Sequence, residues 1–201
     1  MLYDDESAWH AWPGYRHWFN KLWLSDQLGY TCGPGCVDVP KPDHYMVRPV
    51  INLYGLGAGA EIKYLKDGYG VPPGYFWCEV FWGEHITIDL EWQGGWKPVR
   101  TMLGIKHSET KFAKWQRVER DVELPQLLDE LAPVGKINIE MIGGNLIEVH
   151  LRWNPDPDHD EIIPVHRGDS LTAPSEEYKW IDDEDDVASF APNHRLGFWY
   201  K

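Results

Sequence analysis

The stretch KINIEMIGGNLIEVHLRWNPD, Lys136–Asp156, decides the fold that this sequence predicts. Its pattern is typical of two strands, Ile137–Ile142 and Leu146–Arg152, joined by a turn at residues 143–145. Because successive side chains of a strand point to opposite faces, the apolar residues share one face and the polar residues share the other. The apolar face holds Ile139, Met141, Ile147, Val149 and Leu151, and the polar face holds Asn138, Glu140, Glu148, His150 and Arg152.

The polar face of this hairpin brings two carboxylates together. With a three-residue turn, Glu140 lies opposite Glu148, and Asn138 lies opposite His150. Like charges directly opposite each other in a sheet repel, so the two glutamates either stand in water or share a cation. Two hypotheses follow: a hairpin with one solvated face, and a divalent-metal site.

Composition places the chain among acidic, single-domain proteins of a reducing compartment. It has 201 residues, a net charge of −13 and three cysteines, an odd number that does not form a disulfide framework. The charge argues against general nucleic-acid binding and against a membrane surface, since both need basic faces. No apolar run is long enough to span a membrane and the N-terminus has no signal pattern, so we expect a cytoplasmic protein.

Residues 1–43 predict one helix followed by a glycine- and proline-rich loop. Apolar residues recur every three to four positions over residues 14–28, and Gly29 stands where a helix C-cap glycine belongs. The loop carries Cys32 and Cys36. These thiols are either half of a zinc site or, by default, buried or incidental cysteines.

Residues 44–65 predict two strands around a glycine-rich loop. The strands are His44–Pro49 and Glu61–Leu65, and the loop is GLGAGA over residues 55–60. Glycines let backbone N–H groups approach a phosphate closely, and Arg48 stands before this loop. The spacing matches neither a Walker A nor a Rossmann fingerprint, and a glycine-rich hairpin turn is the equal alternative.

Residues 75–92 predict a second hairpin. Its strands, 75–81 and 84–92, are separated by Trp82 and Gly83, and the second strand alternates apolar and polar residues. Glu79 is a carboxylate within an otherwise apolar run. It therefore needs a hydrogen-bonding partner, a ligand or an edge position.

The remaining segments carry weaker patterns. Residues 94–106 look irregular, and residues 124–131 predict a short helix starting at Pro125. After Pro155 the chain is polar, rich in proline and acidic, and it ends in aromatic residues. We expect residues 157–201 to form an extended arm over the surface or a contact with another subunit.

Taken in order, the segments of residues 44–156 resemble the nucleotide-binding part of the ATP-grasp superfamily. Residues 45–49 (YMVRP) and the loop 55–60 resemble the family's strand and phosphate loop, and residues 78–89 (CEVFWGEHITID) resemble its hinge block. Glu140 and the run Glu148-Val149-His150 resemble the acidic residue and the Glu-x-Asn that hold magnesium in the family. The chain is also similar to uncharacterised proteins of marine tailed phages, a likeness that carries no activity with it.

Three features depart from the family pattern. Arg48 stands where the family has lysine, and arginine holds phosphate bidentately but is bulkier. His150 stands where the family has asparagine, and a nitrogen ligand shifts the metal preference toward manganese, iron or zinc, or removes one metal site. The residues before His44 are too few to form the family's usual N-terminal substrate domain.

The resemblance implies ATP and Mg²⁺ or Mn²⁺ as cofactors. It implies carboxylate activation, in which ATP phosphorylates a carboxylate and an amine or thiol attacks the acyl phosphate. The implied metal ligands are Glu140, Glu148 and His150. The implied catalytic residues are Arg152 and Arg48, and the implied nucleotide contacts are Arg48, Gly57, Gly59 and Glu79.

We therefore predict an α+β fold of mostly antiparallel sheet with few helices, similar to ATP-grasp proteins. Its parts are residues 1–43, a domain over residues 44–156, and the C-terminal arm 157–201. Expected partners are a nucleotide, an unknown carboxylate or amine substrate, and a protein partner or second copy bound through the arm. One alternative is a non-catalytic phage structural or interaction protein, in the host cytoplasm or the virion. Another is a carbohydrate-binding module, whose tryptophans are then exposed and coplanar.

Overall fold

Two antiparallel sheets carry the fold in the computed structural model, which describes residues 4–55, 57–107, 112–183 and 195–201. The small sheet has the order β1-β4-β2-β3, formed by β1 (Cys32–Pro34), β2 (Asp43–Pro49), β3 (Glu61–Leu65) and β4 (Tyr75–Cys78). The large sheet has the order β11-β12-β10-β7-β6-β5-β8-β9. Its strands are β5 (His85–Trp92), β6 (Trp96–Lys106), β7 (Phe112–Arg117), β8 (Lys136–Ile142), β9 (Asn145–His150), β10 (Glu161–His166), β11 (Lys179–Asp182) and β12 (Arg195–Tyr200). The predicted α+β class is confirmed.

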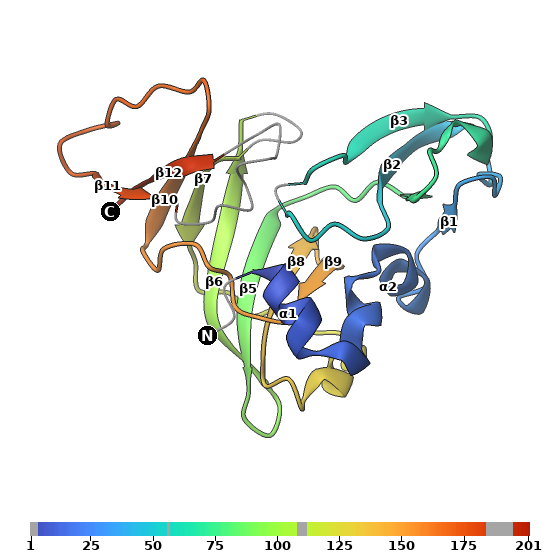
Figure 1. The fold of residues 1–201 in the computed structure, drawn as a ribbon, viewed down its shortest axis with the longest axis horizontal. Coiled ribbons are helices and arrows are strands. Elements are labelled where there is room, and N and C mark those ends of the chain that lie inside the picture. The colour runs from blue at the N-terminus through green and yellow to red at the C-terminus, as the bar shows by residue number, and fades with distance from the viewer. Residues whose placement is uncertain (1–3, 56, 108–111, 184–194) are drawn as a thin grey trace.

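The helices are short and gather at the N-terminus. They are α1 (Asp5–Ala11), the 3-10 helix η1 (Pro13–Phe19) and α2 (Lys21–Gln27), with two further 3-10 helices, η2 (Gly68–Gly70) and η3 (Gln126–Leu131). Figure 1 shows α1 and α2 beside the hairpin β8–β9 of the large sheet, with the small sheet lying apart on the right. Within the described residues, no helix has the length and apolar character that crossing a membrane requires.

The single helix predicted over residues 14–28 is wrong, because the chain turns at Asn20. This residue has an extended backbone (φ −85°, ψ 100°), and its side chain accepts a hydrogen bond from the N–H of Trp23. Asparagine is a strong helix N-cap, so it ends η1 and starts α2 in place of one continuous helix. Gly29 does have the predicted left-handed conformation, with φ +73°.

We expect Asn20→Ala to lower the free energy of unfolding by about 0.5–2 kcal/mol, the usual cost of losing an N-cap. The bond from Trp23 N–H to Asn20 Oδ1 is 2.9 Å long and is lost in this variant. Urea denaturation followed by tryptophan fluorescence measures the change. Asn20→Asp keeps an acceptor at the same position, and a loss as large as that of alanine would contradict a capping role.

The main core lies between the N-terminal helices and one face of the large sheet. Trp18, Leu24 and Leu128 meet the apolar face of β5, β8 and β9, where Ile88 and Ile139 are fully buried. The apolar face predicted for the central hairpin is confirmed except near its turn.

A β-bulge near the turn changes which residue of β9 faces the core. Glu140 pairs with Glu148, but Met141 pairs with Leu146. Because β9 thereby carries one extra residue, Leu146 joins the core in place of the predicted Ile147, which lines a cavity on the other face. The turn consists of Gly143 and Gly144, since Asn145 already pairs with Ile142.

The second predicted hairpin, over residues 75–92, is wrong. β4 pairs with β1 and β2 in the small sheet, whereas β5 pairs with β6 and β8 in the large sheet. The linker between them bends at Gly83, whose φ of +124° strongly favours glycine. Glu79, in this linker, is half-buried, and its carboxylate accepts a hydrogen bond from the N–H of Thr31 at 2.8 Å, which provides the expected partner.

Two predictions for residues 93–134 also change. Residues 94–106, expected to be irregular, contain the 11-residue strand β6. Pro98 interrupts the strand pattern, and the structure accommodates it with a register shift opposite Asp89 and Leu90. The helix predicted at 124–131 exists as the 3-10 helix η3.

The C-terminal residues form sheet where an extended arm is predicted. β10 pairs with β7, β12 pairs with β10, and β11 pairs with β12. Ile162 and Phe198 are buried between these strands and Met102, so apolar burial holds the segment in place. Residues 184–186 of the acidic tract lie outside the described residues.

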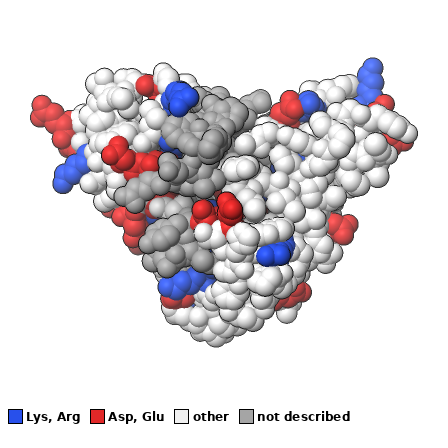
Figure 2. Space-filling model, in the orientation of Figure 1, with Lys and Arg blue, Asp and Glu red and all other residues white. Residues whose placement is uncertain are grey.

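The tryptophans do not form a carbohydrate platform. All twelve lie in the described ranges, and Trp82 alone is exposed, at 74%. The others are buried or half-buried, as general packing requires. On the face drawn in Figure 2, lysine and arginine side chains stand singly and no basic patch appears among the atoms that are described.

Candidate functional site

A cavity of about 300 Å³ lies between the two sheets. One wall comes from the small sheet and its glycine-rich segment, including Arg48, Gly57 and Glu79. The facing wall comes from the polar face of β5, β8 and β9, including Glu140 and Glu148. The cavity therefore joins segments that lie about 90 positions apart in the sequence.

The two glutamates of the central hairpin face each other as predicted. Glu140 is the register partner of Glu148, and Asn138 is the partner of His150. Ligand atoms of Glu140, Glu148 and His150 all lie within 4.8 Å of one another. These are the three residues predicted to hold a metal.

Glu140 and Glu148 each also lie close to a basic side chain. The Lys21 ammonium lies 2.7 Å from Glu148 Oε1, and His85 Nε2 lies 2.9 Å from Glu140 Oε2. His150 Nε2 lies between the glutamates, 3.8 Å from Glu140 Oε1 and 3.7 Å from Glu148 Oε1. The other ring nitrogen of His150 lies 2.7 Å from the Asp5 carboxylate.

The cluster strongly shifts the protonation of its members. Burial opposes a charge on His150, but the Asp5 carboxylate and the two glutamates outweigh it and raise the pKa of His150 to about 10. Burial likewise opposes ionisation of Glu140, but hydrogen bonds from His150 and His85 hold the pKa of Glu140 well below its usual value. At neutral pH Glu140 is therefore ionised and His150 is protonated.

The two arginines predicted to contact phosphate both line the cavity and both have partners. Arg48 Nη2 donates to the carbonyl of Ile147 at 3.1 Å, and its guanidinium lies over the ring of Phe76. Arg152 Nε lies 2.9 Å from Asp5 Oδ1. Arg48 thus ties the small sheet to β9 at the cavity.

The glycine-rich segment turns back on itself beside the cavity. Gly57 and Gly59 have φ values of +60° and +78°. Gly57 lines the cavity, whereas Gly59 packs on Tyr75, where an added Cβ would lie 2.6 Å from the tyrosine hydroxyl. Leu56 of this segment lies outside the described residues.

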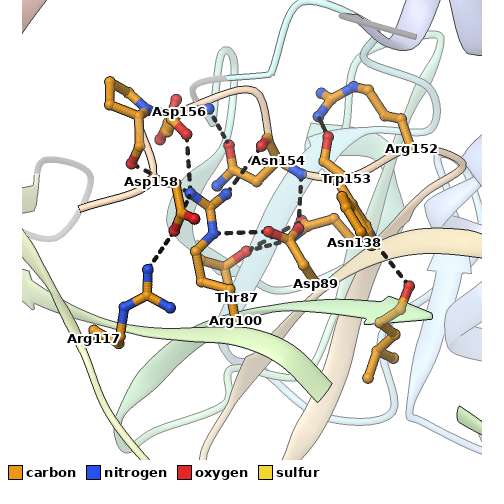
Figure 3. Close-up of polar contacts among 12 residues, drawn as sticks. Thr87, Asp89, Arg100, Arg117, Asn138, Arg152, Trp153, Asn154, Asp156 and Asp158 are labelled. Carbon is orange, nitrogen blue, oxygen red and sulfur yellow. Dashed lines mark hydrogen bonds and ion pairs between the residues drawn. The ribbon is translucent and has the colours of Figure 1, made fainter. Parts of the chain in front are cut away.

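A buried polar network holds the segment that follows β9. Asp89 accepts hydrogen bonds from Arg100 Nε (2.8 Å), Asn138 Nδ2 (2.9 Å) and the N–H of Asn154 (2.7 Å). Arg100 also donates to the carbonyls of Asn154 and Asp156, both at 2.9 Å. Figure 3 shows this network, which fixes Asn154 and Asp156 at the cavity wall.

Sequence reasoning missed Asp5, Lys21, His85 and the pair Asp89–Arg100. Asp5 and Lys21 sit on short helices where acidic and basic residues are ordinary, and nothing in their neighbourhood marks them as buried. The strand alternation of residues 84–92 does place His85 and Asp89 on one polar face, and that signal was available.

Comparison with known proteins identifies solved structures with a similar fold. No protein-family model matches this sequence, and no curated protein matches it. Among solved structures, carboxyaminoimidazole ribonucleotide synthase from Aspergillus clavatus in complex with ATP is similar, with a TM-score of 0.55 and 11% identity over 94% of this chain and 69% of that one. A protein described as an ATP-grasp superfamily member from Archaeoglobus fulgidus is also similar, with a TM-score of 0.51 and 10% identity over 92% of this chain.

These likenesses show an ATP-grasp-like fold. The chain spans 65% of the length of the Archaeoglobus protein. At this identity the likeness shows the fold alone.

The donor set of the cluster fits a divalent ion. Ligand atoms of two carboxylates and one imidazole lie within 4.8 Å of one another, and such mixed oxygen and nitrogen ligands suit Mn²⁺ better than Mg²⁺. Because His150 is protonated in the ion-free cluster, it must give up a proton before its nitrogen can hold the ion. The Asp5 carboxylate also lies at the second ring nitrogen of His150, the arrangement that commonly orients a metal-binding histidine. The ion would compete with Lys21 for Glu148 and with His85 for Glu140.

Proposed function

We propose that this protein binds ATP with a divalent metal ion, and that it is an ATP-dependent carboxylate–amine or carboxylate–thiol ligase. One observation carries the proposal: Glu140 and Glu148 are register partners on one wall of a cavity whose other wall is the glycine-rich segment beside Arg48. Paired carboxylates hold metal ions, and glycine-rich backbone with arginine holds phosphate. The ATP-grasp-like fold supports the same assignment.

The residues of the cavity suit distinct roles. Glu140, Glu148 and His150 would hold the metal, which supplies charge neutralisation of the phosphates when bound. Arg48 and Gly57 would contact the phosphate chain from the small sheet, with Gly59 shaping the turn. Glu79, in the linker between the sheets, would face the adenine amine or ribose. Arg152 would neutralise the transferred phosphoryl group.

The proposed reaction has two steps. The γ-phosphoryl group of ATP passes to an oxygen of the carboxylate substrate, forming an acyl phosphate and ADP. An amine or thiol then attacks the acyl carbon and releases inorganic phosphate. Positioning and charge neutralisation are the contributions that such a transfer requires of a protein. The proposed partners are a nucleotide and a small carboxylate.

We expect Glu148→Gln to weaken metal-dependent ATP binding at least about tenfold, because one charged ligand is lost from the ion. Calorimetric titration of ATP and ADP with Mg²⁺ or Mn²⁺, on the wild type and this variant, measures the effect. Glu130→Gln, at a residue exposed on η3, is the matched control and should leave binding unchanged. Equal binding by the wild type and Glu148→Gln, or no binding by the wild type at protein concentrations suited to millimolar affinity, contradicts the proposal.

The second candidate is a non-catalytic structural or interaction protein on the same fold, such as a phage component. It is favoured by a specific observation: the carboxylates of the cluster are already paired with Lys21, His85 and His150. In that case the cluster is a structural ion-pair network, and Glu148→Gln affects stability but not ligand binding. The same titration distinguishes the two functions.

A further inference from the structure

Lys21 is a lysine buried beside the predicted metal ligands. Its side chain is 8% exposed, and its ammonium lies 2.7 Å from Glu148 Oε1. Lys21 begins α2, which Asn20 caps, and its own N–H donates to the carbonyl of Val50. The helix start and this backbone bond together hold the residue at the cavity wall.

Burial of a lysine is costly unless its charge is compensated. The side chain of Lys21 meets Glu148, whose side chain is itself 17% exposed. The same oxygen of Glu148 faces His150 Nε2 at 3.7 Å. The ammonium therefore binds the atom that points into the predicted metal site.

The charges of the cluster can be counted without its histidines. The cluster contains three carboxylates and two side chains with a permanent positive charge, so its net charge without the histidines is −1. The carboxylates belong to Asp5, Glu140 and Glu148, and the cations are Lys21 and Arg152. Without Lys21 the net charge would be two negative. Metal ligation requires a neutral His150, and in that state a divalent ion matches the cluster that lacks Lys21, whereas with Lys21 in place the same ion makes the cluster positive.

We propose that Lys21 is a built-in cation of this site, which takes the place of a divalent ion at Glu148 and limits the metal affinity of the cluster. A metal that enters must compete with Lys21 for Glu148, and Lys21 contributes a positive charge to the cavity wall where the nucleotide phosphates are proposed to lie. This placement of the phosphates rests on the proposed function; the competition between Lys21 and a metal ion does not.

The test is titration of Mn²⁺ alone, without nucleotide, by electron paramagnetic resonance and calorimetry. Lys21→Met removes the charge, and we expect it to bind Mn²⁺ at least about tenfold more tightly than the wild type, because a positive charge a few ångströms from the ion is gone. Lys21→Gln, which keeps a hydrogen-bond donor toward Glu148, should show the same gain in Mn²⁺ affinity. This variant still tests the inference if Lys21→Met misfolds. The double variant Lys21→Met/Glu148→Gln should lose the gain.

Lys41→Met is the matched control, since it also removes one positive charge but from an exposed pair with Asp43. Its Mn²⁺ affinity should equal that of the wild type. Unchanged or weaker Mn²⁺ binding in folded Lys21→Met and Lys21→Gln would overturn the inference. Because no nucleotide is present, a tighter Mn²⁺ site in a protein that fails to bind ATP would retain the inference and reject only the proposed function.

Discussion

Replacing Arg100 with methionine is expected to lower the free energy of unfolding by about 3–5 kcal/mol, the usual cost of breaking a buried ion pair from one side. The side chains of Arg100 and Asp89 are 7% and 5% exposed, and they meet at 2.8 Å. Methionine fills the space of the arginine stem but leaves the Asp89 carboxylate buried without its cation. It also frees the carbonyls of Asn154 and Asp156. Urea denaturation monitored by fluorescence and by circular dichroism measures the loss.

Arg117→Met is the control for this variant, because Arg117 is half-buried and its partners Asp158 and Asp160 are exposed. Figure 3 draws the pair of Arg117 with Asp158. Exposed pairs contribute at most about 1 kcal/mol, so the two variants should differ severalfold. Similar losses would mean that the network of Asp89 and Arg100 does not hold the segment after β9. In Arg100→Met we also expect weaker nucleotide binding, since that segment forms part of the cavity wall.

Gly143→Ala is expected to destabilise the protein by about 2–5 kcal/mol. Gly143 has a φ of +56°, where a side chain costs about 1–2 kcal/mol. A Cβ added there would also lie 2.1 Å from the backbone oxygen of Trp82, and relieving such a contact adds about 1–3 kcal/mol. Its N–H donates to the carbonyl of Glu84 at 2.9 Å, so the turn of the central hairpin rests directly on the linker between the sheets.

The neighbouring residue provides the control. Gly144 has a φ of +84°, but an added Cβ there meets no atom within 4 Å. Gly144→Ala should therefore show the backbone cost alone, about 1–2 kcal/mol. Equal melting temperatures of the two variants would show that the contact between the turn and Trp82 is not a tight one in solution.

Local sequence patterns were sufficient for the central hairpin and for much of the small sheet. Alternation and turn residues placed Glu140 opposite Glu148, and they placed β2 and β3 to within one residue. The fold class follows from the same pattern. The bulge that buries Leu146 in place of Ile147 was not predictable from alternation, since it depends on the twist and packing of the finished sheet.

The rest of the site depends on contacts distant in sequence. The bond between Asp5 and His150 joins residues 145 positions apart, and no local pattern pairs them. β6 was missed because Pro98 and a register shift interrupt its alternation. The pairing of β4 with the small sheet was missed because two adjacent strands usually form a hairpin, and only the bend at Gly83 separates them.

The packing of α1 and α2 against β9 has a consequence for how the protein is made. Asp5 and Lys21 leave the ribosome long before His150 and Glu148, so during synthesis these two charges lack the partners that they have in the folded protein. Contacts this distant in sequence form slowly because a long loop must close first. The N-terminal segment therefore cannot form the cluster of charges until the central hairpin has been synthesised.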